Sequence, residues 1–84
     1  MDTLELSTVD KVLNILAIIT KTDEVKKNLD LRLYDVDLLD SFGTVQLMVE
    51  LSEIFNVEIS PAEFEREDWA TPRKIISYIE NRIK

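Results

Sequence analysis

A serine that follows an aspartate at the start of an apolar segment is the feature of this sequence with the clearest chemical potential. Asp40 and Ser41 stand in the stretch DLLDSFGTVQLMVELSEIF, residues 37–55, and the only glycine of the 84 residues is Gly43. The chain has no histidine and no cysteine. A Ser-His nucleophile, a thiolate metal site and a glycine-rich phosphate loop are therefore excluded, and an enzyme is disfavoured.

Ser41 is open to three interpretations. Ser and Asp are both favoured at helix N-caps, and if the Ser41 hydroxyl is the cap, Ser41→Ala would cost about 1 kcal/mol. A nucleophilic Ser41 would need an adjacent base; only a Ser-Lys pair is left, and nothing in the sequence points to one. In the third interpretation another enzyme modifies the hydroxyl, since a phosphate there would face the free N–H groups and the positive dipole of a helix start.

The charge balance limits the partners of this chain. Seventeen acidic and ten basic residues give a formal net charge of −7, which argues against nucleic acid and anionic lipid. The start, MDTLELSTVDK, lacks the basic flank and apolar run of a signal peptide, and no stretch is long enough for a membrane span. We expect a single domain over residues 1–84 that is cytoplasmic, monomeric and not inserted into a membrane.

Helical periodicity predicts a first helix over about residues 4–21, with Thr3 or Ser7 as its cap. Its apolar face is formed by Val9, Val12, Leu13, Leu16 and Ile19, and is widened by Ile15 and Ile18. Residues 22–40 have no sustained helical period, although leucines alternate with polar residues at positions 29, 31 and 33. Since a lone strand would have no partner, we predict a long loop whose leucines contact the core.

A second helix is predicted from Ser41 to about residue 56. Its core stripe at 100° per residue consists of Leu47, Met48, Leu51, Ile54 and Phe55. Three apolar residues, Phe42, Val45 and Val49, fall on a different side, near the direction of Ser41. They form either a docking face for a partner or a surface that the leucine-rich loop covers.

Two Pro-containing helix starts follow. Ser60, Pro61 and Glu63 have the pattern of a capping box and predict a short helix. Thr71 and Pro72 predict the start of a final helix with a buried stripe formed by Ile75, Ile79 and Ile83. We interpret Trp69 as a core residue rather than a partner contact. The predicted fold is all-α, a small bundle of three longer helices and one short helix.

Several segments resemble a known superfamily. LLDSFGTVQLMVELSEIF, residues 38–55, resembles the phosphopantetheine-attachment segment of the acyl carrier protein superfamily, in which Asp-Ser-Leu or a variant opens the second helix. The order of helix, long loop, Ser-led helix, short helix and final helix is also similar. FEREDWATPRKI, residues 64–75, and EVKKNLDLRLYDVDLLDSFGTVQL, residues 24–47, resemble the D-alanyl carrier proteins more than the fatty-acid carriers.

The resemblance implies a carrier without catalytic groups of its own. Ser41 would bear 4′-phosphopantetheine, added by a phosphopantetheinyl transferase, and the arm would supply the thiol that the chain lacks. A D-alanine–carrier ligase would use ATP to load D-alanine as a thioester. Membrane-bound O-acyltransferase machinery would then use it to D-alanylate teichoic acids of the Gram-positive cell wall. The alternatives are a freestanding acyl or peptidyl carrier with another cargo, and a non-covalent helical adaptor.

The second helix departs from the fatty-acid carriers. Gly43, Gln46, Ser52 and Ile54 stand where those carriers often place acids, so that only Glu50 and Glu53 remain. A weakly charged helix with Phe42, Val45 and Val49 exposed favours partners that dock by apolar contact. Negative charge lies instead in the preceding loop, at Asp35, Asp37 and Asp40. These acids either orient a basic transferase, with Asp40 the strongest candidate, or are ordinary solvated loop residues.

Overall fold

The computed structural model describes residues 7–83, except for the side chain of Glu63. It contains three longer α-helices, α1 (Thr8–Thr20), α3 (Ser41–Phe55) and α4 (Pro72–Arg82). A single-turn helix, α2 (Glu24–Lys27), and two 3₁₀ turns, η1 (Pro61–Glu63) and η2 (Arg66–Trp69), lie between them. No strand occurs within residues 7–83, so the predicted all-α bundle is confirmed.

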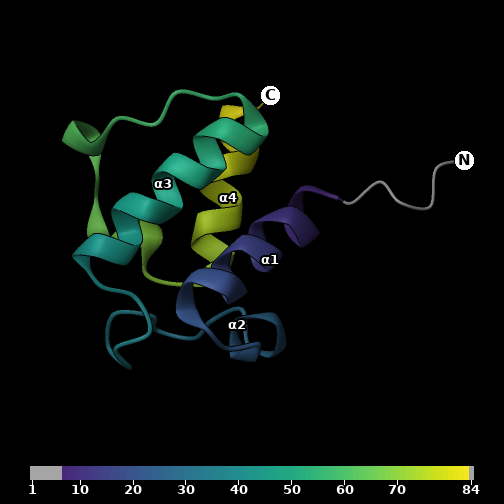
Figure 1. Cartoon of the computed structure of the whole chain (residues 1–84), viewed down its shortest axis with the longest axis vertical. Helices are drawn as coiled ribbons and strands as arrows, with labels where there is room; N and C mark the ends of the chain where they lie inside the picture. The colour runs from purple at the N-terminus through teal and green to yellow at the C-terminus, as the bar shows by residue number, and fades with distance from the viewer. Residues whose placement is uncertain (1–6, 84) are drawn as a thin grey trace, which may run out of the picture.

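Helix α1 packs against both α3 and α4, and Figure 1 shows the three longer helices lying together. The Ser7 hydroxyl caps α1 by accepting a hydrogen bond from the Asp10 N–H at 3.1 Å, so one of the two predicted caps is confirmed. The other, Thr3, lies outside the described residues. Val12 and Leu16 are completely buried, but Ile18 is 76% exposed, and the prediction that Ile18 widens the buried face is wrong.

The core joins all three longer helices. Its fully buried members include Leu47 and Leu51 of α3 and Ile75 and Ile79 of α4. Trp69 is 1% exposed, with its ring centroid 5.1 Å from that of Tyr78 and 6.3 Å from that of Phe64. Trp69 is therefore a core residue, as predicted, and packs η2 against α4.

Two isoleucines placed in predicted core stripes are exposed instead. Ile54 lies in the last turn of α3 and is 48% exposed, although its neighbour Phe55 packs against the core. Ile83 follows the last residue of α4. Periodicity gives the direction of a side chain around its helix, but it does not say how far the neighbouring elements extend.

The long connection between α1 and α3 is a loop except for the turn of α2, and its leucines contact the core as predicted. Val25 and Leu33 are completely buried, while Leu29 and Leu31 are partly buried against the core. Two backbone hydrogen bonds of 2.9 Å attach the loop to distant segments: the Leu33 N–H donates to the Ala70 carbonyl, and the Arg73 N–H donates to the Leu29 carbonyl.

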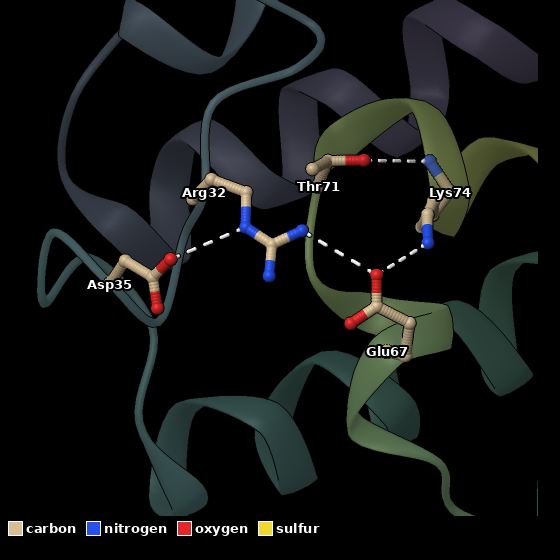
Figure 2. A network of polar contacts seen from close by, with 5 residues as sticks. All are labelled: Arg32, Asp35, Glu67, Thr71 and Lys74. Atoms are coloured by element: carbon tan, nitrogen blue, oxygen red, sulfur yellow. Dashed lines mark hydrogen bonds and ion pairs between the residues drawn. The ribbon is translucent and has the colours of Figure 1, made fainter.

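A network of exposed ion pairs reinforces this attachment (Figure 2). In the loop, Arg32 lies 3.3 Å from Asp35 and 3.5 Å from Glu67 of η2. Glu67 also accepts from the Lys74 ammonium of α4 at 2.7 Å. Because the hydrogen bonds and the ion pairs join the same segments, they set the position from which the loop runs on to Ser41.

The two predicted Pro-containing helix starts differ in the structure. The Thr71 hydroxyl accepts from the Lys74 N–H at 3.2 Å, and Pro72 is the first residue of α4, as expected (Figure 2). Ser60 precedes η1 but makes no side-chain capping bond, and η1 is a single 3₁₀ turn. The predicted capping bond of Ser60 is therefore wrong, and only a short helical turn forms there.

Candidate functional site

At the start of α3, the residue that caps the helix and the residue with an exposed hydroxyl are different, which the sequence could not show. Asp40 is the N-cap: its carboxylate accepts a hydrogen bond from the Gly43 N–H at 2.7 Å. Ser41 is the first helical residue, its side chain is exposed, and its hydroxyl makes no hydrogen bond with any described residue. Asp40 is the cap, so the interpretation of Ser41 as the cap is wrong and its hydroxyl is not used in capping.

Gly43 allows the start of α3 to approach its surroundings closely. A Cβ atom on Gly43 would lie 3.2 Å from Leu39 Cδ1, 3.3 Å from Asp40 Oδ1 and 3.6 Å from Ile19 Cγ2. The glycine therefore brings the loop, the capping carboxylate and α1 together beneath Ser41. The scaffold under the exposed hydroxyl is rigid because buried contacts surround it.

A cleft of about 430 Å³ opens beside Ser41. It lies between the start of α3 and the η1–η2 connection, and its apolar lining includes Val45, Met48 and Phe64. The carboxylates of Asp37 and Asp40 and the guanidinium of Arg66 are also at its surface. The cleft thus offers both apolar surface and charges of each sign next to the hydroxyl.

Tyr34 forms one wall of this cleft and is linked to the helix start. Its hydroxyl lies 2.7 Å from Thr44 Oγ1, and the Thr44 hydroxyl in turn lies 2.7 Å from the Asp40 carbonyl. Since that carbonyl can only accept, the Thr44 proton is used there and Tyr34 is the donor to Thr44. Burial raises the pKa of Tyr34 above its ordinary value, because it disfavours the charged phenolate.

The Arg66 guanidinium lies over the face of Tyr34, with its central carbon 4.5 Å from the ring centroid. Arg66 and Tyr34 are 32 positions apart in the sequence. The sequence analysis missed both residues as parts of the site. An Arg and a Tyr at such a separation carry no local pattern, so only the fold reveals their contact.

The apolar residues near Ser41 are uncovered. Phe42, Val45 and Val49 are 79%, 51% and 49% exposed, and the leucine-rich loop does not shield them. We call these three residues the α3 apolar patch. Asp40, Ser41 and the patch are contiguous along the first turns of α3, so that one approaching protein can contact all of them.

The charged residues of the cleft bear on the Ser-Lys pair that a nucleophilic Ser41 would need. No lysine lines the described cleft, and the charged residues beside Ser41 are two aspartates and one arginine. Within residues 7–83 there is no group of carboxylates that could hold a metal ion. An exposed hydroxyl at a capped helix start, next to a roomy cleft with a cation, fits a serine that receives a phosphate-linked group from another protein.

Comparison with protein families gives the class of this chain. Residues 10–79 match the family model described as "Phosphopantetheine attachment site". The all-helical fold and the serine at the start of α3 agree with that match. Members of this class are non-catalytic carriers, and 4′-phosphopantetheine is their cofactor.

The similar proteins narrow the class further. The D-alanyl carrier protein of Lacticaseibacillus rhamnosus is 55% identical over 69 residues, covering 82% of this chain and 85% of the relative. Those of Listeria monocytogenes serotype 4a (strain HCC23) and Enterococcus faecalis (strain ATCC 700802 / V583) are each 46% identical over 71 residues, covering 84% of this chain and 91% of each relative. The chain therefore belongs to the D-alanyl carrier protein family, as its resemblance implied.

None of the helices in the described part of the chain combines the length and the apolar character that crossing a membrane requires.

Proposed function

We propose that this chain carries D-alanine as a thioester on a 4′-phosphopantetheine arm attached to Ser41, and delivers it for the D-alanylation of teichoic acids. The observation that carries the proposal is the exposed Ser41 hydroxyl at the first residue of α3. This hydroxyl is not needed as the helix cap, because Asp40 caps α3. The names of the relatives support D-alanine as the cargo.

The chemistry is divided between the chain and its partners. The arm supplies a thiol, which this chain lacks because it has no cysteine. For attachment, the Ser41 oxygen forms a phosphoester bond while the pyrophosphate bond of coenzyme A breaks and the nucleotide leaves. No described side chain hydrogen-bonds the Ser41 hydroxyl, so we assign the base that accepts its proton to the phosphopantetheinyl transferase.

The α3 apolar patch supports docking of these partners. Together with Asp40, Phe42, Val45 and Val49 form the surface that we assign to the transferase, the D-alanine–carrier ligase and the membrane-bound O-acyltransferase machinery. Glu50 and Glu53 are exposed on the same helix. With only these two acids on α3, apolar contact contributes more to docking than electrostatic steering does.

Intact mass tests the attachment. The protein is incubated with coenzyme A and a broad-specificity phosphopantetheinyl transferase, beside Ser41→Ala and the control Ser77→Ala, which removes an exposed hydroxyl of α4. We expect one phosphopantetheine on the wild type and on Ser77→Ala and none on Ser41→Ala. No gain on the folded wild type would contradict the proposal and favour a non-covalent adaptor.

The cargo needs a second step in the same tube. Addition of ATP, D-alanine and the matching ligase is expected to add one alanyl group, which neutral hydroxylamine removes because the linkage is a thioester. Loading of another acid in preference to D-alanine would instead identify a carrier with a different cargo.

A further inference from the structure

Arg66 is the cation of the cleft beside Ser41, and its bonding differs from that of two other arginines. Arg32 and Arg73 each pair with carboxylates, Arg73 with Asp30 at 2.8 Å. Arg66 has no described carboxylate within 4 Å and lies instead over the Tyr34 ring. Its N–H groups donate to no described residue, so they are available for an anion.

A chain of contacts fixes Arg66 relative to the start of α3. Arg66 stacks on Tyr34, the Tyr34 hydroxyl donates to Thr44, and the Thr44 hydroxyl donates to the Asp40 carbonyl. Arg66 and Ser41 line the same cleft. The guanidinium is thus held against the wall of the space into which a group on Ser41 would extend.

The charges around this space favour such a cation once Ser41 is modified. Asp37 and Asp40 already place two carboxylates at the cleft, and Asp40 is engaged as the cap of α3. A phosphodiester on Ser41 adds a further negative charge at the same place. Arg66 is the only cationic residue in the described lining, so it is the side chain that can offset this charge by direct contact.

We propose that the Arg66 guanidinium, held on the ring of Tyr34, binds the phosphodiester of the arm and directs the first part of the arm along the cleft towards Met48 and Phe64. This inference rests on the proposed attachment at Ser41. It assigns to a residue of the η2 turn a binding role for the prosthetic group, separate from the surface that contacts partner proteins. Since Arg66 is exposed, the contact is reversible and is weakened by salt.

The test compares the unmodified and modified wild-type proteins by nuclear magnetic resonance, after intact mass has shown complete modification. The Nε–Hε resonance of Arg66 is expected to shift on modification, and the shift is expected to diminish as salt is raised. The Arg73 resonance is the internal control, because its guanidinium is engaged by Asp30 away from the cleft. Contacts between the methyl groups of the arm and the Phe64 ring protons would show the direction of the arm.

Matched variants give a second readout. Arg66→Gln is expected to change the phosphorus-31 chemical shift of the modified protein, to remove the arm–Phe64 contacts and to leave the fold intact. Arg73→Gln should leave the phosphorus-31 chemical shift at its wild-type value. Arg66→Lys should give a shift between those of the wild type and Arg66→Gln, because an ammonium cannot bind in a bidentate manner.

The two proposals fail in distinguishable ways. A wild type that gains no mass contradicts the attachment at Ser41. A wild type that gains the arm, but whose Arg66 resonance stays where it was and whose phosphorus signal is insensitive to Arg66→Gln, contradicts the role of Arg66 alone. Pairing of Arg66 with Glu65 or Glu67, which line a neighbouring cleft with Tyr34, would give this second result.

Discussion

The Asp40 carboxylate lies 2.7 Å from the Gly43 backbone nitrogen and caps α3, while the adjacent Ser41 hydroxyl remains exposed. The residue that stabilises the helix and the residue that is available for modification are therefore different, although they are neighbours. A group attached to Ser41 does not have to displace a capping bond.

Substitutions at these two positions are expected to have separate effects. Asp40→Ala should lower the free energy of unfolding by about 1 kcal/mol, because it removes the N-cap of α3. Ser41→Ala should change it by less than about 0.5 kcal/mol, as is typical of an exposed site without special contacts. Urea unfolding of both variants, followed by circular dichroism, checks this. A larger loss for Ser41→Ala than for Asp40→Ala would contradict the assignment of the cap.

A charge in the α3 apolar patch should impair loading without unfolding the protein. Val49→Asp is expected to reduce the rate of D-alanine loading by the ligase, since it places a carboxylate where apolar contact is proposed, and to alter stability little because Val49 is half-exposed. Gln46→Asp is the control: it adds the same charge to an exposed position of the same helix. Equal rates for the two variants would argue against docking through the patch.

The pKa of Glu67 is expected to lie below its ordinary value of 4.5. The hydrogen bond from Lys74 is the main cause, and the nearby charges of Lys74 and Arg32 act in the same direction. Lys74→Gln should therefore raise this pKa more than Arg32→Gln does, in a carbon-13 titration of the Glu67 carboxyl group. Because the folded-state pKa is lowered, the associated stabilisation is present above the ordinary value and is lost as the pH falls through the lowered pKa.

The opposite pH dependence is expected for Tyr34. Burial raises its pKa above 10.0, so its contribution to stability is present below that value and is lost as the pH rises through the raised pKa. Tyr34→Phe should be less stable at neutral pH by about 1 kcal/mol, because the hydrogen bond to Thr44 is lost. The difference between the two proteins should shrink at alkaline pH in parallel urea titrations, whereas a constant difference would show that Tyr34 does not titrate as its burial requires.

Local patterns predicted several features of this fold that depend on neighbouring residues, although the capping bond expected of Ser60 does not form. Ser7 and Thr71 cap α1 and α4 as expected, because an N-cap needs only an oxygen and an N–H three positions later. The same rule could not choose between Asp40 and Ser41, since both residue types are favoured and they differ by one position. The hydrogen bond from the Gly43 N–H to the Asp40 carboxylate identifies Asp40 as the cap.

Features that depend on distant segments were beyond such patterns. Ile18, Ile54 and Ile83 have the spacing of core residues, yet no neighbouring element covers them. The stacking of Arg66 on Tyr34 likewise follows from the way the η2 turn lies against the long loop. The sequence located the serine and the patch around it, whereas the cleft beside the serine emerged from the packing of three separate segments.

The attachment of the long loop to Ala70 and Arg73 also has a consequence for the time at which the site is completed. Leu33 and Leu29 bond to residues about 40 positions later, and such non-local contacts form slowly and only after both segments exist. During synthesis, when N-terminal segments emerge first, α3 can acquire its Asp40 cap from residues within its own first turn. The loop that leads to it must wait until η2 and the start of α4 have left the ribosome. A transferase that recognises the finished loop would therefore modify the chain only after residues 70–73 have been translated and have bonded to the loop.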